Sequence, residues 1–471
     1  MAGSSLAPLL AVLYGSGFLA GFNENLVNMA LVPIMGEYGV GSVTAQWLVT
    51  GYMIAVTVVV TCMAFLYRRF AVRRLFLAAA GLSFAGSLGG LVAPGFAALV
   101  AARLVQAVGT GIFIPLMMNV IVSRLPRASM GTYLAIGSSM ITLGPALAPV
   151  VTGFMVSGLG WRSVFLVPLA GAALLAAAGW TVVRGGESSP EVRLDAPSAA
   201  LAAAGLVALS FGLSEVALAP ARGGVALVAA ALDAVAFVRR SRRCAHPLVS
   251  LEPLRSPAFR PAAVLVVVAM MTSFSLSVMV PLYLEGAGGM SAAAAGGLLL
   301  GPVLCNAGAT VWGGRVMDRC GEWPLLPVGF AIAAAGLAAA AAGALAGSLA
   351  AVMAGVFAGY AGSGLLLSPA QTAGLRTLPD DQNPHGVALM STSVQLAACV
   401  GPAAYIGVMA AVEARVAALA TAGAGALAVD AASAGFAAAE ALACVVALAG
   451  LAVAVRYARR MRRERAARVA R

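Results

Sequence analysis

The chain has 471 residues, of which 61% are hydrophobic and only 10% are charged. Soluble domains carry about 25% charged residues, so this composition excludes a soluble fold. The formal net charge of +12 could suggest nucleic-acid binding, but the Arg residues cluster between apolar stretches, which indicates membrane topology instead. In lipid, a backbone stays hydrogen-bonded only as helices or as a closed barrel. The apolar stretches do not alternate at period two, so they predict helices.

The apolar stretches predict fourteen membrane spans, each needing about 20 predominantly apolar residues. The first stretch is too long for a cleavable signal peptide and lacks its basic start, so it is interpreted as a span. The predicted spans cover residues 7–35, 43–66, 75–93, 96–122, 131–156, 163–183, 198–218, 223–238, 261–284, 292–313, 324–346, 349–375, 385–411 and 436–457.

The distribution of Arg predicts the orientation of these spans. The loops after the even-numbered spans and the C-terminal tail carry nearly all of the Arg, as at 68–74, 239–243 and 456–471. Because cytoplasmic loops are rich in basic residues, both termini are predicted to be cytoplasmic, in a multi-pass protein of the cell (inner or plasma) membrane. The six Cys show no paired spacing that would indicate disulfides or a metal site.

The sequence also repeats itself weakly across its two halves. The segment 109–115 in span 4 corresponds to 362–369 in span 12, and Gly144-Pro145 in span 5 corresponds to Gly401-Pro402 in span 13. Two repeated halves around a shared site are typical of secondary transporters. The predicted organisation is an N-terminal six-helix bundle (1–184), a linker with two extra membrane helices and a cytoplasmic loop (185–259), a C-terminal six-helix bundle (260–458) and a basic cytoplasmic tail (459–471).

Short motifs stand on these spans in a familiar order. Span 1 carries Asn28-Met-Ala-Leu31 before Pro33, span 2 begins with Gln46-Trp47, and span 4 carries Arg103 with Gln106. Further residues of these motifs are Tyr52, Gly109, Gly111, Gly137, Gly144, Pro145, Pro149, Trp161, Arg162, Phe165, Gly362, Gly364, Pro369 and Gln395. Together the motifs resemble the major facilitator superfamily, specifically its fourteen-span drug:proton antiporter family, over nearly the whole chain. The resemblance implies an all-α membrane fold of two six-helix bundles plus two inserted linker helices.

The loop after span 2 departs from the pattern of the resembled family. Arg68 stands where the family has an Asp, and Ala64 and Ala71 replace two Gly. In the family that Asp belongs to a charge latch between the two halves, so the resemblance implies a latch that cannot form here in the usual way. The second-half copy of the loop keeps its motif, in Asp318, Arg319 and Gly321.

Ionisable residues inside a membrane are costly and are therefore candidates for function. Glu24 in span 1 and Arg103 in span 4 are predicted to lie at similar depth, since each residue adds about 1.5 Å along a helix. We predict that they pair, with proton entry or a cationic substrate competing for Glu24; a permanent structural ion pair is the alternative. The resemblance leaves open whether Asn23 or Glu24 occupies the acidic position of the family, and the two differ by about 100° around the helix.

Several uncharged polar residues are candidates to line a cavity, or equally to join helices by hydrogen bonds. They are Asn28, Gln46, Gln106, Asn306, Gln371 and Gln395. The helix with Gly137, Gly144, Pro145 and Pro149 corresponds to the span-5 antiporter motif, which in the resembled family seals one half against the other. Asp233 is predicted to pair with Arg239 and Arg240 at the membrane surface, and Glu440, at the start of span 14, is predicted to face water.

These observations predict a secondary active transporter that exports amphipathic or cationic small molecules in exchange for protons by alternating access. The alternative is an uncoupled transporter, or a lipid or metabolite translocator of the same fold. No phosphate-binding loop, catalytic cluster or metal-ligand cluster is present, so neither enzymatic activity nor a cofactor is predicted, and the proton gradient is the expected energy source. The predicted partners are a small-molecule substrate, protons and membrane lipids, without nucleic acid, and the chain is predicted to be a monomer.

Overall fold

The computed structural model describes residues 6–40, 42–45, 47–126, 129–185, 195–216, 220–244, 251–290, 292–321, 324–379, 382–421 and 430–469. Within these ranges all regular structure is helical. The first half contains α1 (Leu6–Asn25), α2 (Leu31–Tyr38), α3 (Ser42–Ala45), α4 (Trp47–Arg69), α5 (Val72–Leu91), α6 (Phe96–Arg124), α7 (Met130–Leu159) and α8 (Leu166–Val182). The remaining helices are α9 (Ala196–Glu215), α10 (Pro220–Arg243), α11 (Phe259–Gly286), α12 (Ala292–Cys320), α13 (Leu325–Leu345), α14 (Leu349–Gly364), α15 (Leu367–Leu375), α16 (Asn383–Thr421) and α17 (Ala431–Val469).

Twelve helical segments in the described ranges are long and apolar enough to cross a membrane. Two more apolar segments, Trp47–Met63 and Ala196–Leu209, are shorter and lie at the predicted second and seventh spans. The all-helical architecture is thus confirmed, while the count of fourteen spans stays a prediction.

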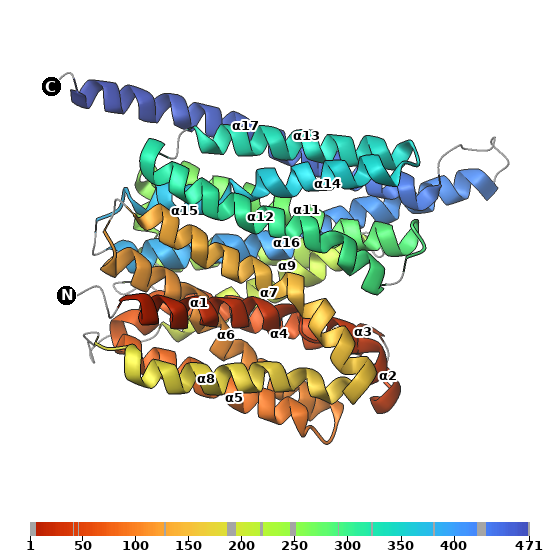
Figure 1. Ribbon diagram of the computed structural model, residues 1–471, viewed down its shortest axis with the longest axis horizontal. Helices are drawn as coiled ribbons and strands as arrows, with labels where there is room; N and C mark the ends of the chain where they lie inside the picture. The colour runs from red at the N-terminus through yellow and green to blue at the C-terminus, as the bar shows by residue number, and fades with distance from the viewer. Residues whose placement is uncertain are drawn as a thin grey trace.

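The helices gather into two bundles (Figure 1). α1 and α4–α8 pack on one another, and so do α11–α17, while α9 and α10 form a hairpin that packs on α4 and α16. The bundles meet mainly where α7 packs on α12 and where α16 packs on α4 and α6. The predicted domain boundaries fit this arrangement of helices but stay a prediction.

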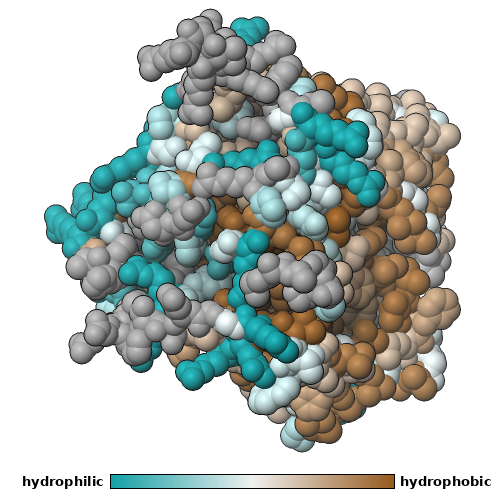
Figure 2. All heavy atoms as spheres, turned by 60° about the vertical axis from the view of Figure 1, so that its left-hand side comes forward, coloured by the Kyte–Doolittle hydropathy of each residue, from teal (hydrophilic) through white to brown (hydrophobic). Residues whose placement is uncertain are grey.

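The chain begins and ends at the same end of the bundles, which we call the terminal end (Figure 1). Seen from there, hydrophilic residues cover this end, and hydrophobic residues cover the adjoining flank (Figure 2). Arg68, Arg74 and Arg319 are exposed where their helices reach this end. This segregation is what a protein needs when its flanks face lipid and its ends face water.

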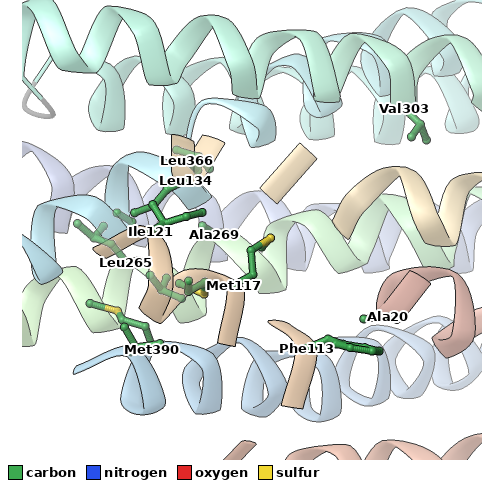
Figure 3. Packing of buried hydrophobic residues seen from close by; sticks show 14 of the residues in the cluster. Ala20, Phe113, Met117, Ile121, Leu134, Leu265, Ala269, Val303, Leu366 and Met390 are labelled. Carbon is green, nitrogen blue, oxygen red and sulfur yellow. The ribbon is translucent and has the colours of Figure 1, made fainter. Parts of the chain in front are cut away.

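Apolar side chains of both bundles pack together near the terminal end (Figure 3). Ile121 of α6 and Leu134 of α7 belong to the same buried cluster as Leu265 of α11 and Leu366 before α15. All four side chains are at most 2% exposed, so this cluster joins the two bundles through a contact that is shielded from solvent.

Two membrane helices are interrupted where the sequence predicts continuous spans. α1 ends at Asn25, and a short 3-10 turn at Asn28–Ala30 precedes α2; likewise α14 ends at Gly364 and α15 begins at Leu367. Pro33 and Pro369 follow these breaks. Because a proline ring clashes with the carbonyl four residues earlier and provides no N–H, each Pro loosens the preceding turn. The predicted spans 7–35 and 349–375 are therefore broken helices.

α1 and α7 cross in close contact just before the break in α1. A Cβ atom added to Gly21 would lie 2.3 Å from the Ile141 carbonyl oxygen, and one added to Gly144 would lie 2.4 Å from the Phe22 nitrogen. Only glycine permits this backbone approach. The crossing therefore fixes the position of the chain that leads into Asn23 and Glu24.

We predict that Gly144→Ala destabilises the protein by about 1–3 kcal/mol, because the new methyl group overpacks the crossing of α1 and α7. Gly153→Ala is the matched control on α7, since a Cβ atom there meets nothing within 4 Å. Thermal unfolding in detergent should show a lower Tm for Gly144→Ala only. Equal Tm values for the two variants would contradict the close crossing.

Candidate functional site

Where α1 ends, its last carbonyls lose their regular helical partners, and a buried Arg binds one that keeps only a long 3.5 Å bond from the Leu26 N–H. The carbonyl oxygen of Asn23 accepts a hydrogen bond from Nη2 of Arg103, at 3.1 Å. The last carbonyls of any helix need such partners, and a guanidinium is a strong donor. Arg103 lies on α6 and is 1% exposed, so the protein itself must satisfy its charge.

The remaining contacts of Arg103 come from α4 and α6. Its Nη1 donates to Oε1 of Gln106 at 2.5 Å, and its Nε points to the Leu48 carbonyl at a longer 3.5 Å. The guanidinium carbon lies 4.0 Å from the centre of the Tyr52 ring, which is a cation–π contact. Arg103 thus joins α1, α4 and α6 around one buried charge.

Gln106 and Asn23 extend this arrangement into a buried polar network. Nε2 of Gln106 donates to Oγ of Ser87 at 2.9 Å and lies 3.5 Å from Oδ1 of Asn23. Nδ2 of Asn23 lies 3.4 Å from Oγ1 of Thr110. All four side chains are 0% exposed. The network of Asn23, Arg103, Gln106, Ser87 and Thr110 is named the Arg103 network below.

Glu24 adjoins this network without joining it. Its side chain is only partly buried, and no ion pair with Arg103 forms within the described residues. It does lie within electrostatic range of the Tyr52 side chain, which also contacts Arg103. The predicted Glu24–Arg103 pair is therefore not made in this conformation. One residue turns a helix by about 100°, so Asn23 faces α6 and Glu24 cannot.

The other predicted polar residues serve in different places. Asn306 donates from Nδ2 to the Tyr360 carbonyl at 2.9 Å, so it joins α12 to α14. Gln371 on α15 and Gln395 on α16 are buried in the second bundle. In the predicted antiporter-motif helix, Gly137 and Pro145 lie on α7 with Gly144. The side chains of Asn28, Gln46 and Pro149 lie outside the described residues.

The structure holds the two bundles together at the terminal end through Asp318, the last acidic residue of α12. Its carboxylate accepts hydrogen bonds from the backbone N–H of Gly131 at 3.0 Å and of Thr132 at 2.7 Å, and from the Thr132 hydroxyl at 2.6 Å. Arg376, which follows α15, pairs with the same carboxylate at 2.7 Å. A carboxylate at a helix N-terminus is favoured because free N–H groups and the helix dipole meet it there. This Asp318 latch therefore bonds the start of α7 to the second bundle.

Two glycines shape the latch: Gly131 leaves room for the Asp318 carboxylate, and Gly321 ends α12 just after Asp318. A Cβ atom on Gly131 would lie 2.6 Å from Oδ1 of Asp318. Gly321 adopts a φ of +83° directly after α12, and its N–H bonds the Met317 carbonyl at 2.8 Å. Arg319 points outward and is exposed. In the first half, Arg68 lies exposed in the last turn of α4, and the described residues show no hydrogen bond or ion pair from it.

Sequence reasoning missed a clip at the opposite end of the first bundle. Oε1 of Glu37, on α2, pairs with Nη1 of Arg162 at 2.6 Å, and its Oε2 accepts the Trp161 indole N–H at 2.6 Å. Arg162 also donates to the Tyr38 hydroxyl at 3.2 Å. The hydrogen bonds from Trp161 and Arg162 hold the pKa of Glu37 below its usual value. Trp161-Arg162 was visible as a motif, but nothing in the sequence indicated Glu37 as its partner.

A second prediction that the structure corrects concerns the linker helices. Arg240 does not pair with Asp233; it donates to Asp195 from Nη2 at 2.7 Å and from Nε at 3.1 Å. Burial opposes ionisation of Asp195, but the bonds from Arg240 and Ser198 outweigh it and lower the pKa of Asp195. Asp233 instead packs on α9, where a Cβ atom on Gly205 would meet its carboxylate. Arg240 pairs with Asp195 because Asp195 caps α9 beside the end of α10. This contact joins segments that are far apart in the sequence.

The sequence profile of the Major Facilitator Superfamily matches residues 13–402. The chain belongs to the major facilitator superfamily. Among curated relatives, it is 30% identical over 412 residues to the lincomycin resistance protein LmrB of Bacillus subtilis, covering 86% of this chain and 85% of the relative. It is 28% identical to the methylenomycin A resistance protein of Streptomyces coelicolor, covering 83% of each chain.

Solved structures agree with this family assignment at the level of the fold. The proton:xylose symporter XylE aligns with a TM-score of 0.66 at 14% identity, covering 96% of this chain and 95% of the symporter. The human organic anion transporter MFSD10 aligns with a TM-score of 0.67 at 12% identity, covering 95% and 99%. The protein is thus a multi-pass membrane protein of a transporter family, and its relatives are transporters rather than enzymes.

We predict that Arg103→Lys lowers stability by about 1–3 kcal/mol, because one ammonium group cannot bridge the acceptors on α1 and α6 or stack on Tyr52. Arg124→Lys is the matched control, since Arg124 ends the same helix and makes one exposed bond to the Arg184 carbonyl at 2.8 Å. Thermal unfolding in detergent checks this. A Tm for Arg103→Lys equal to that of the control would contradict a structural role for the network.

We predict that Asp318→Asn opens the terminal end more often, because the amide cannot accept all the bonds of the latch or pair with Arg376. The probe is the rate of thiol labelling at Ser139→Cys in a variant without native Cys; Ser139 is 1% exposed and bonds the Ala307 carbonyl across the two bundles at 3.1 Å. Loss of about 1.4 kcal/mol from the closed state would raise labelling about tenfold. Arg319→Gln, next to the latch, should leave the rate unchanged. The latch hypothesis fails if both variants label alike.

Proposed function

We propose that the protein exports amphipathic or cationic small molecules in exchange for protons by alternating access. The observation that carries the proposal is the position of Glu24, a partly exposed carboxyl group at the break of a membrane helix, beside the buried Arg103 network. Interrupted helices with ionisable groups near the middle of the membrane are characteristic sites for substrates and coupling ions.

The two parts of this site have different tasks in the proposal. The Arg103 network is fully buried and bonded, so it holds the α1 break in a fixed shape. Glu24 has no ion pair within the described residues and keeps access to solvent, so its charge is available to a ligand. A carboxylate binds a cation by charge, and the same group binds a proton. Proton and cationic substrate therefore compete for Glu24, which is the exchange that an antiporter needs.

Alternating access requires that the terminal end opens and closes. The Asp318 latch and the apolar cluster of both bundles support a conformation closed at that end. The clusters of Arg there support a cytoplasmic location for it and for both termini, in the cell membrane. In this conformation Glu24 would face the opposite side of the membrane, where a proton enters and an exported substrate leaves.

The substrate class is supported by the relatives. LmrB is named for resistance to lincomycin, and a Mycobacterium tuberculosis relative, 27% identical over 402 residues, is named a multidrug resistance protein B homolog. We propose lincomycin, lipophilic cations and neutral amphipathic drugs as the first compounds to test.

We predict that Glu24→Gln lowers the rate of drug transport driven by a pH gradient at least about tenfold, because the amide neither carries a proton nor attracts a cation. The measurement is substrate-induced proton flux in proteoliposomes of wild type, Glu24→Gln and the control Glu413→Gln, a partly buried carboxyl on α16. Drug-linked flux in Glu24→Gln at the wild-type rate would exclude Glu24 as the carrier. Wild-type drug movement without any proton flux would instead favour an uncoupled or lipid-translocating transporter.

A further inference from the structure

A second carboxyl group is enclosed in the C-terminal bundle, where the sequence predicted contact with water. Glu440 of α17 is 0% exposed, and neither of its carboxyl oxygens has a hydrogen-bond partner among the described residues. It lies about 14 Å along the axis from Ala431, where α17 begins, which is near the middle of a span about 30 Å thick. The prediction was wrong because α17 begins earlier than its predicted span, at Ala431 rather than at 436, so Glu440 lies deeper.

The surroundings of Glu440 contain polar groups but no charge. Within the described residues, the polar groups close enough to interact with it are Ser275 from α11, Tyr360 from α14, Tyr405 from α16, and Cys444 from α17 itself. α13, which also packs on α17, carries no titratable or charged side chain, and its Ala334 carbonyl accepts the Cys444 thiol at 3.4 Å. No Arg is among these neighbours, so nothing there neutralises a carboxylate.

The hydrogen-bond directions indicate which form of Glu440 fits this place. While Ser275 donates its hydroxyl proton to the Thr272 carbonyl at 2.9 Å, its oxygen is left to accept from Glu440, and donating to Glu440 instead would break that bond. The Tyr405 hydroxyl is also buried and has no partner. A protonated carboxyl can donate to Ser275 or accept from Tyr405 after a small rotation, whereas an unpaired carboxylate here would cost many kcal/mol. The group therefore fits as a neutral acid.

No hydrogen bond of Glu440 links two helices in the part of the chain that the structure describes. Polar residues that join membrane helices make interhelical hydrogen bonds, as Asn306 does, but Glu440 makes none within the described residues. Leucine, of similar size, would pack here without an unsatisfied polar group. Burying this unpaired carboxyl group thus costs free energy without stabilising the helix packing. Such a residue inside a membrane protein is a candidate for function.

We propose that Glu440 is a second proton-binding site, located between α11, α14, α16 and α17, that is occupied by a proton in this conformation and exchanges it when these helices admit water. This goes beyond the function proposed for Glu24, and it does not depend on the identity of the drug. The two sites differ in kind, because Glu24 is open to a ligand and Glu440 is closed to all but a proton.

The first test is the infrared absorption of purified protein, without drug, recorded across neutral and alkaline pH in H₂O and in D₂O. We expect a C=O band of a protonated carboxyl group that persists above neutral pH, exchanges slowly with deuterium, and is lost in Glu440→Gln. The band should remain in the matched controls Glu24→Gln and Glu413→Gln. Tyr405→Phe should shift the band without removing it, which assigns the band even if Glu440→Gln does not fold. Absence of the band in wild type, or its persistence in folded Glu440→Gln, would overturn the proposal.

The second test separates a working proton site from a static one. In proteoliposomes, drug accumulation driven by a pH gradient should be at least about tenfold lower for folded Glu440→Gln than for wild type. Exchange of labelled for unlabelled drug, which needs no net proton movement, should stay within about twofold of wild type. If both activities are unchanged, the proton on Glu440 is not exchanged, and the proposal fails. A result in which Glu24→Gln alone is inactive would leave the antiporter proposal standing and reject this one.

Discussion

A guanidinium that is buried in a membrane protein must find all of its partners inside the protein, and the first bundle is organised around that requirement. Arg103 obtains them from a carbonyl freed by the break in α1, from Gln106 one turn along α6, and from the face of Tyr52. The break exists because Pro33 disfavours a continuous helix, and the close crossing at Gly144 holds the broken end in place. The candidate site is thus a consequence of a local backbone defect that one charge stabilises.

The two halves of the repeat have diverged in how they close the terminal end. The second half keeps Asp318, whose carboxylate binds the start of α7 and Arg376. The first half has Arg68 at the corresponding loop, pointing into solvent. A latch made from one carboxylate, backed by an apolar cluster, gives a closed state held by a small number of directional bonds.

The two membrane carboxyl groups illustrate how environment assigns different chemistry to the same side chain. Glu24 stands at a helix break, partly open to solvent, next to a cation whose own bonds are already satisfied. Glu440 stands in a continuous helix near hydroxyl-bearing side chains, and no cation among the described residues acts on it. Because Glu24 is open to solvent, a proton and a cationic ligand can compete for it. Because Glu440 is closed to solvent, only a proton is small enough to bind it.

Composition and local pattern determined much of this protein. Long apolar stretches with few charges require helices in lipid, and the distribution of Arg and the ordered motifs indicated the family, which the match over residues 13–402 confirmed. Asn23, Arg103 and Gln106 were also selected from sequence, because buried polar residues in spans are costly. Only the tertiary structure decided which of Asn23 and Glu24 faces α6, that Glu37 pairs with Arg162, and that Glu440 is dry. These depend on rotation about helix axes and on contacts between distant segments, and a rotation of one residue, about 100°, is invisible in a sequence that is apolar on every side.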